Sequence, residues 1–440
     1  MKLAATMFVA VFITGVALVT SSAAKTAHRT GSVPAQVALD WNTNAVATVR
    51  AATTTVDGPA RPLYQTEGLI YLSYVQAAVY DADVAIEGRY QPYGFSLFAP
   101  PGASPAAAVA AAAHDVLAYE FPDQKAALDG LYATSLASMP DGRAKTDGVS
   151  VGQAAAMGII ATRSNDGRNA PTPVSGTPGP VVPGQWQIVP PATTAQTPWV
   201  ASMHPFLLRS PSQFRPGPPP ALNSWTSKRD LAEVQAFGAK ASTAHTTLVR
   251  TQAQTDTAYF WNANAINQFN QALRDLATQH GMDLSDTTRL LAMGDLVVTD
   301  AGIACFDAKY TYLFWRPYTA IRSGADPDWL PLLNTPNHPE YPSAHGCVTG
   351  ALTQVMAKAL GTDHINVDIW GAQGGASTLT TTRHFQTVGD IDSQIVDARV
   401  WIGFHYRSTV IAGLDVGSQV ANWTLERYFR PVWHRGRHDG

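Results

Sequence analysis

Three short phrases between residues 309 and 405 place cationic and nucleophilic side chains in apolar and aromatic surroundings. They read KYTYLFWRP from residue 309, YPSAHG from residue 341 and ARVWIGFH from residue 398, and they contribute Lys309, Arg316, Ser343, His345, Arg399 and His405. Charges are costly to bury without partners, so a convergent set of cations in such surroundings indicates an anion between them. The phrases therefore predict a site for a small oxyanion, either phosphate or its analogue vanadate.

In the first phrase, Lys309 and Arg316 are seven residues apart. That spacing is about two turns of an α-helix and places both side chains on one helix face. Pro317 is then expected to end or kink the helix. The planar fork of a guanidinium and the compact charge of an ammonium together suit an oxyanion. The alternative is a solvated stripe of charge, so this phrase is weak by itself.

In the second phrase, Ser343 and His345 precede an apolar run at residues 348–360, which predicts a helix. Ser343 is a plausible N-cap, and the free N–H groups of the first helical turn, starting at Ala344, would then face an anion. His345 would lie in that turn, where it could act as an acid or a base near neutral pH. An ordinary cap and a core histidine are the alternative.

In the third phrase, Arg399 and His405 are six residues apart, a spacing that an ideal helix does not place on one face. Either the segment bends near the glycines at 403 and 413, or the two side chains approach the anion from different sides. The sequence leaves both arrangements open.

Taken together and in this order, the phrases resemble the signature of the vanadium-dependent haloperoxidases and of the acid phosphatases in the type-2 phosphatidic-acid-phosphatase superfamily. That signature reads Lys-x6-Arg-Pro, then Pro-Ser-Gly-His, then Ser-Arg-x5-His-x3-Asp. The first phrase matches in full, whereas Ala344 replaces the glycine, Ala398 the serine and Thr409 the final aspartate. The wider context, FWRP and PEYPSAH, is more similar to the haloperoxidase branch.

The resemblance implies that His405 binds the vanadium of a vanadate cofactor through a ring nitrogen. It assigns charge neutralisation and hydrogen bonding of the oxyanion to Lys309, Arg316, Ser343, Ala344 and Arg399. It further implies that His345 takes a proton from hydrogen peroxide and that Lys309 polarises the oxidant, so that halide is oxidised to a hypohalous species. His338 is implied as a neighbour of the site that influences halide handling, with an exposed loop histidine as the alternative.

The missing carboxylate at Thr409 would normally orient the histidine and raise its basicity. Asp397 and Asp415 are near in sequence and are candidates to replace it. Two other functions remain open beside the haloperoxidase. One is a phosphomonoesterase in which His405 forms a phosphohistidine and His345 protonates the leaving alcohol. The other is an inactive oxyanion-binding relative.

The elements that must position these residues read as helices, and no alternating strand pattern of any length is evident. Apolar spacing predicts helices at 62–86, 103–119, 125–139 and 145–163 in an N-terminal region, residues 25–166. In a C-terminal region, residues 223–432, it predicts helices at 228–243, 247–261, 263–279 and 285–315 and a helical stretch at 381–429. The predicted fold class is all-α, a multi-helix bundle of the type that the resemblance implies.

Residues 167–222 differ from both regions because they are dense in proline and glycine. The segment is too long for an ordinary connector, and it carries Trp186, Trp199, Phe206 and Phe214, unlike a solvated linker. We predict an ordered excursion packed over the helices, which could form a rim of the substrate channel.

The N-terminus has an apolar run at residues 3–20 followed by small residues, which predicts a signal peptide at 1–24 and a secreted or periplasmic protein. No later stretch reaches transmembrane length without charge or proline, which argues against an integral lipid phosphatase. In an exported protein Cys305 and Cys347 could form a disulfide, with free buried thiols as the alternative. The tail at 433–440 is polar, and its two histidines could bind metal only adventitiously.

The length of 440 residues and the hydrophobic content of 45% allow a large core. A formal net charge of −3 with only 14% charged residues provides no polybasic surface, which argues against nucleic acid as a partner. The expected partners are small molecules: hydrogen peroxide, halide and an organic acceptor, or a phosphate ester. The sequence predicts no particular oligomeric state.

Overall fold

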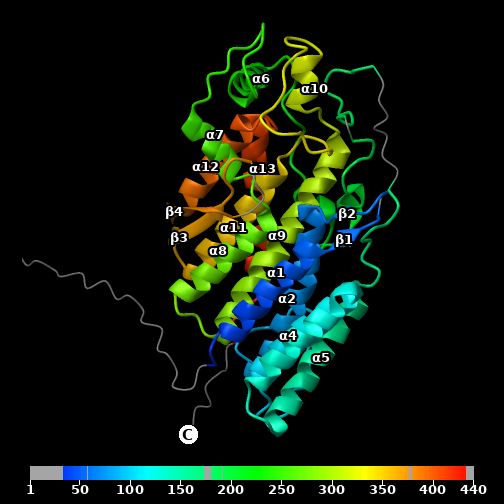
Figure 1. The fold of residues 1–440 in the computed structure, drawn as a ribbon, viewed down its shortest axis with the longest axis vertical. Helices are drawn as coiled ribbons and strands as arrows, with labels where there is room; N and C mark the ends of the chain where they lie inside the picture. Colours follow the sequence, from blue (N-terminus) through cyan, green and yellow to red (C-terminus); the bar gives the residue numbers. More distant parts are fainter. Residues whose placement is uncertain (1–32, 57, 173–179, 191, 376–378, 433–440) are drawn as a thin grey trace, which may run out of the picture. The chain divides into compact units, whose positions relative to one another are not determined.

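The computed structural model describes residues 33–56, 58–172, 180–190, 192–375 and 379–432. The predicted signal peptide at 1–24 and the tail at 433–440 lie outside the described residues. Thirteen α-helices and two short antiparallel strand pairs occur in the described ranges, so the fold is the all-α helical bundle that the sequence predicts (Figure 1). Within these ranges, no helix combines the length and the apolar character needed to cross a membrane.

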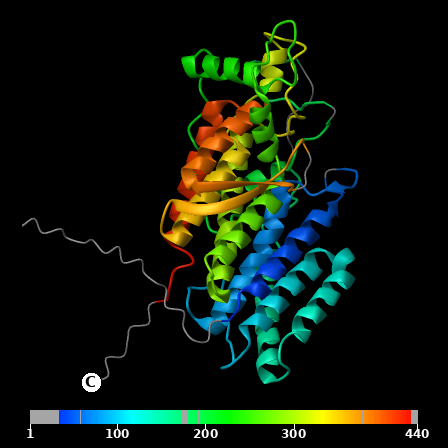
Figure 2. The same cartoon turned by 60° about the vertical axis from the view of Figure 1, so that its left-hand side comes forward.

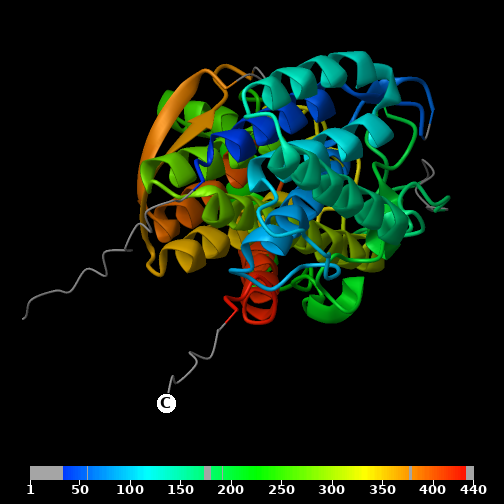
Figure 3. The ribbon, with the colours of Figure 1, turned by 90° about the horizontal axis from the view of Figure 1, so that it is seen from below.

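The N-terminal half contains α1 Gln36–Ala51, β1 Thr53–Thr54, β2 Arg61–Pro62, α2 Gln65–Glu87, α3 Pro105–Glu120, α4 Lys125–Ala137 and α5 Arg143–Arg163. Small residues let α3 and α5 pack closely. A Cβ added at Gly148 or Gly152 of α5 would lie only 2.3 or 2.2 Å from a backbone carbonyl oxygen of the α3 segment. The alanine-rich sequence of α3 therefore serves close helix packing, and the cyan helices lie together along one side of the bundle in Figure 3.

The C-terminal half contains α6 Trp225–Gly238, α7 Gln252–Phe260, α8 Ala265–Gln279, α9 Leu284–Tyr312, α10 Pro317–Arg322, α11 Ala344–Leu360, β3 His364–Gly371, β4 Thr381–Thr387, α12 Val388–Trp401 and α13 Arg407–Leu425. The central element is α9, in which every residue from Leu290 to Lys309 is buried. It contacts α2, α8, α11 and α13. A helix that is buried all round needs such neighbours on every side.

Helices α11 and α13 meet along a seam of glycines. A Cβ added at Gly417 of α13 would lie 2.0 Å from the carbonyl oxygen of Cys347, and one added at Gly413 would lie 2.6 Å from that of Ser343. The two backbones can approach this closely only because these positions lack side chains. The seam holds the second phrase of the sequence against the helix that follows the third.

Neither strand pair was predicted. Strands β3 and β4 form an antiparallel hairpin that lies across the outside of the C-terminal helices (Figure 2). The expectation of a helix from residue 381 is wrong, because 381–387 pair with β3 and the helix begins only at Val388. In β3, buried Ile365, Val367 and Ile369 alternate with exposed residues, which is the period of a strand with one face on the core.

The described part of the proline-rich segment packs against α9. Its short 3-10 helices span Pro198–Ser202 and Pro211–Phe214, and the side chains of Trp186, Trp199 and Phe206 are buried. The backbone N–H groups of residues 206–208 donate to the carboxylate of Asp300 on α9 at 2.7, 2.7 and 2.8 Å. A buried carboxylate thus satisfies three amides of a segment that has no regular partner strand.

Candidate functional site

The three phrases meet where α9 ends and α11 and α13 begin, at one end of the helical bundle (Figure 1). Arg316 of the first phrase lies 3.2 Å from His405 of the third, measured from Nη1 to Nε2. Lys309 of the first phrase donates to the carbonyl of Pro342 in the second. The polar side chains that meet here are almost fully buried, with exposed fractions of 0% for Lys309, Arg316 and Ser343, 1% for Arg399 and 2% for His405.

The first phrase is not one helix. Leu313 adopts a left-handed conformation (φ 47°) that ends α9, and Arg316 is the N-cap of α10, with Pro317 at the first helical position. The prediction that Lys309 and Arg316 share a helix face is therefore wrong, as is the prediction that Pro317 ends the helix. The proline-rich segment holds the turn, because the N–H of Trp186 donates to the Leu313 carbonyl at 2.7 Å.

Lys309 has its ammonium group fully engaged. Nζ donates to the carbonyl oxygens of Pro339, Glu340 and Pro342 at 2.9, 2.9 and 2.5 Å. An ammonium has three N–H donors, so all of them are directed at the 339–342 loop. Burial lowers the pKa of Lys309 to about 8. The residue therefore contributes charge to the site and fixes the loop that leads into α11.

Arg316 connects two histidines. Its Nη1 donates to the Phe404 carbonyl at 3.1 Å and lies 3.2 Å from His405 Nε2, while Nε donates to the His338 carbonyl at 2.9 Å and Nη2 lies 3.1 Å from His338 Nδ1. His338 is buried against the ring of Phe306, so an exposed loop histidine is excluded. Burial, followed by the charges of Arg316 and Lys309, holds the pKa of His338 well below its usual value.

The second phrase forms the predicted cap. Ser343 Oγ accepts from the N–H of Gly346 at 3.4 Å, Ala344 opens α11, and His345 lies in its first turn. His345 is half-buried, and its Nε2 has no hydrogen-bond partner among the described residues. Burial, with the nearby charge of Arg399, keeps the pKa of His345 well below its usual value. The imidazole is therefore neutral at neutral pH.

In the third phrase the chain bends. Helix α12 ends at Trp401, Gly403 is in a left-handed conformation (φ 84°), and His405 lies in the connection to α13. The bend predicted near residue 403 is confirmed, whereas α13 continues through Gly413 without a break. Gly403 is needed here, because an added Cβ would lie 2.6 Å from the carbonyl oxygen of Gly238.

Arg399 has unsatisfied donors. It lies over the ring of Phe404 at 5.1 Å, and its buried Nε and Nη1 have no hydrogen-bond partner within the described ranges. Buried donors are rarely left unpaired in proteins, and a charged one is the most costly. Burial lowers the pKa of Arg399 to about 9. These unpaired donors of Arg399 fit an acceptor-rich anion.

Glu340 is the residue that the sequence interpretation missed. It is fully buried, and its Oε1 accepts from His405 Nδ1 at 2.7 Å and from the N–H of Tyr406 at 3.2 Å. Asp397 and Asp415 do not take this position, because Asp397 pairs with Arg407 at 2.7 Å and Asp415 is exposed. The only signal in the sequence was an acidic residue within the apolar phrase that precedes Ser343.

The two cysteines are free thiols, so the disulfide that the sequence left open is not formed. Cys305 Sγ donates to the Pro342 carbonyl at 3.6 Å. Burial, followed by the neighbouring thiol of Cys305, raises the pKa of Cys347 well above its usual value. The two thiols are neighbours, Cys305 contacts the loop that Lys309 holds, and both cysteines pack as small apolar side chains.

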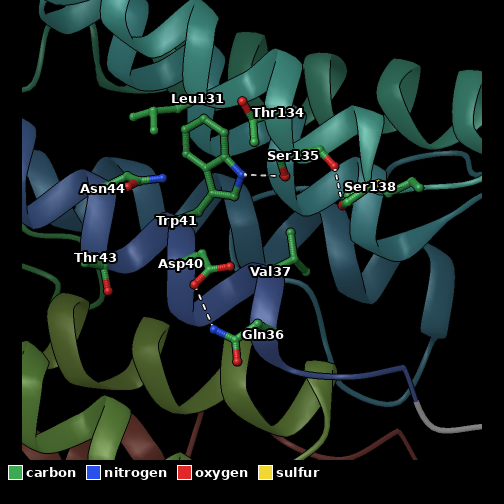
Figure 4. A pocket seen from close by; sticks show the side chains of 11 residues that line it. Gln36, Val37, Asp40, Trp41, Thr43, Asn44, Leu131, Thr134, Ser135 and Ser138 are labelled. Atoms are coloured by element: carbon green, nitrogen blue, oxygen red, sulfur yellow. Dashed lines mark hydrogen bonds between the residues drawn. The ribbon is translucent and has the colours of Figure 1, made fainter.

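A surface pocket lies among other residues. It is lined by side chains of α1 and of the segment 131–139, and the indole of Trp41 donates there to Ser135 at 3.3 Å (Figure 4). No residue of the three phrases lines it. This pocket is therefore separate from the candidate site.

Comparison with known proteins supports the resemblance. Residues 289–433 match the family model described as the VCPO second helical-bundle domain. The vanadium chloroperoxidase of Curvularia inaequalis is 25% identical over 264 residues, which cover 45% of this chain and 43% of that protein. The match therefore spans less than half the length of that relative.

Solved structures show the same fold. The structure of the first bacterial vanadium-dependent iodoperoxidase aligns with a TM-score of 0.73 at 21% identity, over 90% of this chain and 98% of that one. A bacterial vanadium-dependent chloroperoxidase in its apo form aligns with a TM-score of 0.69 at 20% identity, over 82% and 93% of the two chains. The resemblance carried by the three phrases is thus confirmed, and this chain is a relative of the vanadium haloperoxidases with their helical-bundle fold.

Proposed function

We propose that this chain is a vanadate-dependent haloperoxidase that oxidises halide with hydrogen peroxide at a vanadate held by His405. The observation that carries the proposal is the set of unpaired buried donors, Nε and Nη1 of Arg399, near the charge of Arg316. Hydrogen-bond donors of this kind, fixed away from water, bind an oxyanion far more strongly than the same groups in solvent.

The charges fit a dianion. Lys309, Arg316 and Arg399 supply three positive charges, and burial raises the pKa of Glu340 to about 7, so the net charge is +2 when Glu340 is ionised and +3 when it is protonated. Ser343 and the first-turn N–H groups of α11, beginning with that of Ala344, add donors, because a helix N-terminus leaves its first N–H groups without intrahelical acceptors. Vanadate bound there would supply a Lewis-acidic centre that activates hydrogen peroxide toward attack by halide.

The histidines have separate roles in this proposal. His405 offers Nε2 as the ligand atom, because its Nδ1 is already bonded to Glu340. His345, neutral and with Nε2 unpaired among the described residues, is the base that accepts a proton from hydrogen peroxide. Lys309 acts through its charge, since its three donors are directed at carbonyl oxygens. His338 keeps Arg316 in place.

The neutral Nε2 of His405 would also suit the nucleophile of a phosphomonoesterase, so the test must separate the two reactions. Purified protein is incubated with orthovanadate and assayed for peroxide-dependent oxidation of iodide, bromide and chloride, and in parallel for hydrolysis of a chromogenic phosphate ester. We expect halide oxidation that depends on vanadate and is lost in His405→Ala. His384→Ala is the matched control, because His384 is an exposed histidine paired with Asp368 on the hairpin.

Two results would contradict the proposal. Ester hydrolysis that vanadate inhibits, without halide oxidation, would identify a phosphatase instead. A folded protein without either activity would identify an inactive oxyanion-binding relative.

We further propose that the protein is exported, on the basis of the N-terminal sequence alone. The intact mass of protein recovered outside the cytoplasm should correspond to a chain that begins at Lys25. Retention of residues 1–24 would refute this proposal.

A further inference from the structure

We propose that Glu340, supported by Thr409, is the positioning residue of His405: it holds the imidazole with its proton on Nδ1, which leaves the Nε2 lone pair for an oxyanion that displaces the contact with Arg316. This inference takes vanadate as the ligand from the proposed function, whereas the contacts of His405 that support it come from the structure. It explains how the chain can use His405 although Thr409 stands where the resembling signature has an aspartate.

One oxygen of Glu340 collects three donors. Oε1 lies 2.7 Å from His405 Nδ1, 2.6 Å from Thr409 Oγ1 and 3.2 Å from the N–H of Tyr406. Glu340 and Thr409 are 0% and 1% exposed, so water does not compete for these contacts. The hydroxyl of Thr409 thus supports the carboxylate that enters from the 339–342 loop.

The contact with Arg316 fixes the tautomer of the ring. A guanidinium can only donate, so Nε2 must accept from Arg316 Nη1 at 3.2 Å, which leaves Nδ1 to donate to Glu340 at 2.7 Å. Nε2 therefore carries no proton, and its lone pair becomes available to a ligand that displaces the contact with Arg316.

Glu340→Gln has two opposite effects on anion affinity, one through the charge of the site and one through the orientation of His405. Removing a negative charge beside the site strengthens the attraction for every dianion. Releasing His405 weakens only a ligand that bonds to Nε2. Inorganic phosphate, held by charge and hydrogen bonds, should therefore bind as tightly as before or more tightly, while orthovanadate should bind about 10- to 100-fold more weakly. A purely structural role would weaken both anions together.

The experiment compares the wild type, Glu340→Gln, the double variant Glu340→Gln/Thr409→Asp, and the control Asp392→Asn, a carboxyl that bonds Thr353 on α11 and does not contact the site. Binding of orthovanadate and of inorganic phosphate is measured by titration calorimetry. We expect the vanadate affinity of Glu340→Gln to fall selectively and to recover at least tenfold in the double variant. Parallel loss of both anions, or no recovery in a double variant that still binds phosphate, would overturn the inference.

A second measurement needs no vanadate and no change at Glu340. The ¹⁵N resonances of the His405 ring, assigned by comparison with His405→Ala, report the tautomer in the ligand-free wild type. A protonated Nδ1 and an unprotonated Nε2 at neutral pH support the role of Glu340 even if the protein shows no vanadate-dependent activity. A protonated Nε2 would overturn it whatever the activity.

Discussion

Replacing Arg399 by methionine should stabilise the ligand-free protein while it removes oxyanion binding. Arg399 is 1% exposed, and two of its donor nitrogens lack partners in the part of the chain that the structure describes. The fall of its pKa from 12.5 to about 9, caused by burial, corresponds to roughly 5 kcal/mol of unfavourable free energy for the charged form. Methionine keeps the apolar stem that packs on Phe404, so the gain is not cancelled by a cavity.

The measured gain will be smaller than this figure, because the charged form relaxes and attracts water. Replacing buried charges by apolar residues of similar volume stabilises proteins by about 1–4 kcal/mol, and we expect about 1–3 kcal/mol here. Scanning calorimetry of the ligand-free protein should then show a Tm raised by a few degrees. In the wild type, phosphate at 100 times its Kd should add about 2.7 kcal/mol, and this gain should be absent in Arg399→Met.

The matched control is Arg250→Met. Arg250 is also buried, and burial also lowers its pKa, but it donates to the carbonyls of Phe237, Ala239 and Trp401. Its removal leaves three buried carbonyl oxygens without a hydrogen bond and should destabilise the protein by about 1–3 kcal/mol. Arg399→Met could instead lower the ligand-free Tm, as Arg250→Met does, and keep the full rise in Tm that phosphate causes. That result would show that the unpaired donors of Arg399 do not bind the anion.

Three further predictions concern stability. Gly417→Ala should cost about 1–3 kcal/mol in urea unfolding, since its Cβ would meet the Cys347 carbonyl at 2.0 Å, whereas Gly130→Ala, with open space around it, should be neutral or stabilising. Burial raises the pKa of Asp295 to about 7, so the folded state binds more protons and stability should fall as pH rises from about 4 to 7; Asp295→Asn should flatten this part of the Tm profile. Although burial opposes it, hydrogen bonds to two carboxylates raise the pKa of His114, so its stabilisation is present below about pH 6.5 and lost above its raised pKa. His114→Gln should therefore lower Tm more at pH 5 than at pH 9, and an equal loss at both would contradict the ion pairs.

The sequence predicted those parts of the site that depend on local chemistry. Ser343 caps a helix because its hydroxyl can accept from the N–H of Gly346, three residues on. The bend before His405 follows from a glycine in a left-handed conformation. Both features are set within a few residues, so pattern and residue type were sufficient to find them.

The long-range contacts of the site could not be predicted from the sequence. Glu340 and His405 are 65 residues apart and no periodicity joins them, so the partner of His405 was sought among its neighbours in the chain. The spacing of Lys309 and Arg316 indicated a shared helix face, but the left-handed Leu313, held by the proline-rich segment, ends the helix between them. Tertiary contacts decided both positions, and a single sequence does not record them.

The ammonium of Lys309, whose hydrogen bonds are all used within the protein, can attract anions to this site but cannot distinguish one anion from another. Because its hydrogens are committed to three carbonyl oxygens, Lys309 can draw in an anion at a distance but cannot sense its shape. Shape must then be recognised by the forked guanidinium of Arg399, whose unpaired nitrogens fix both direction and spacing. Tetrahedral and trigonal anions should therefore bind with similar association rates and differ chiefly in their dissociation rates.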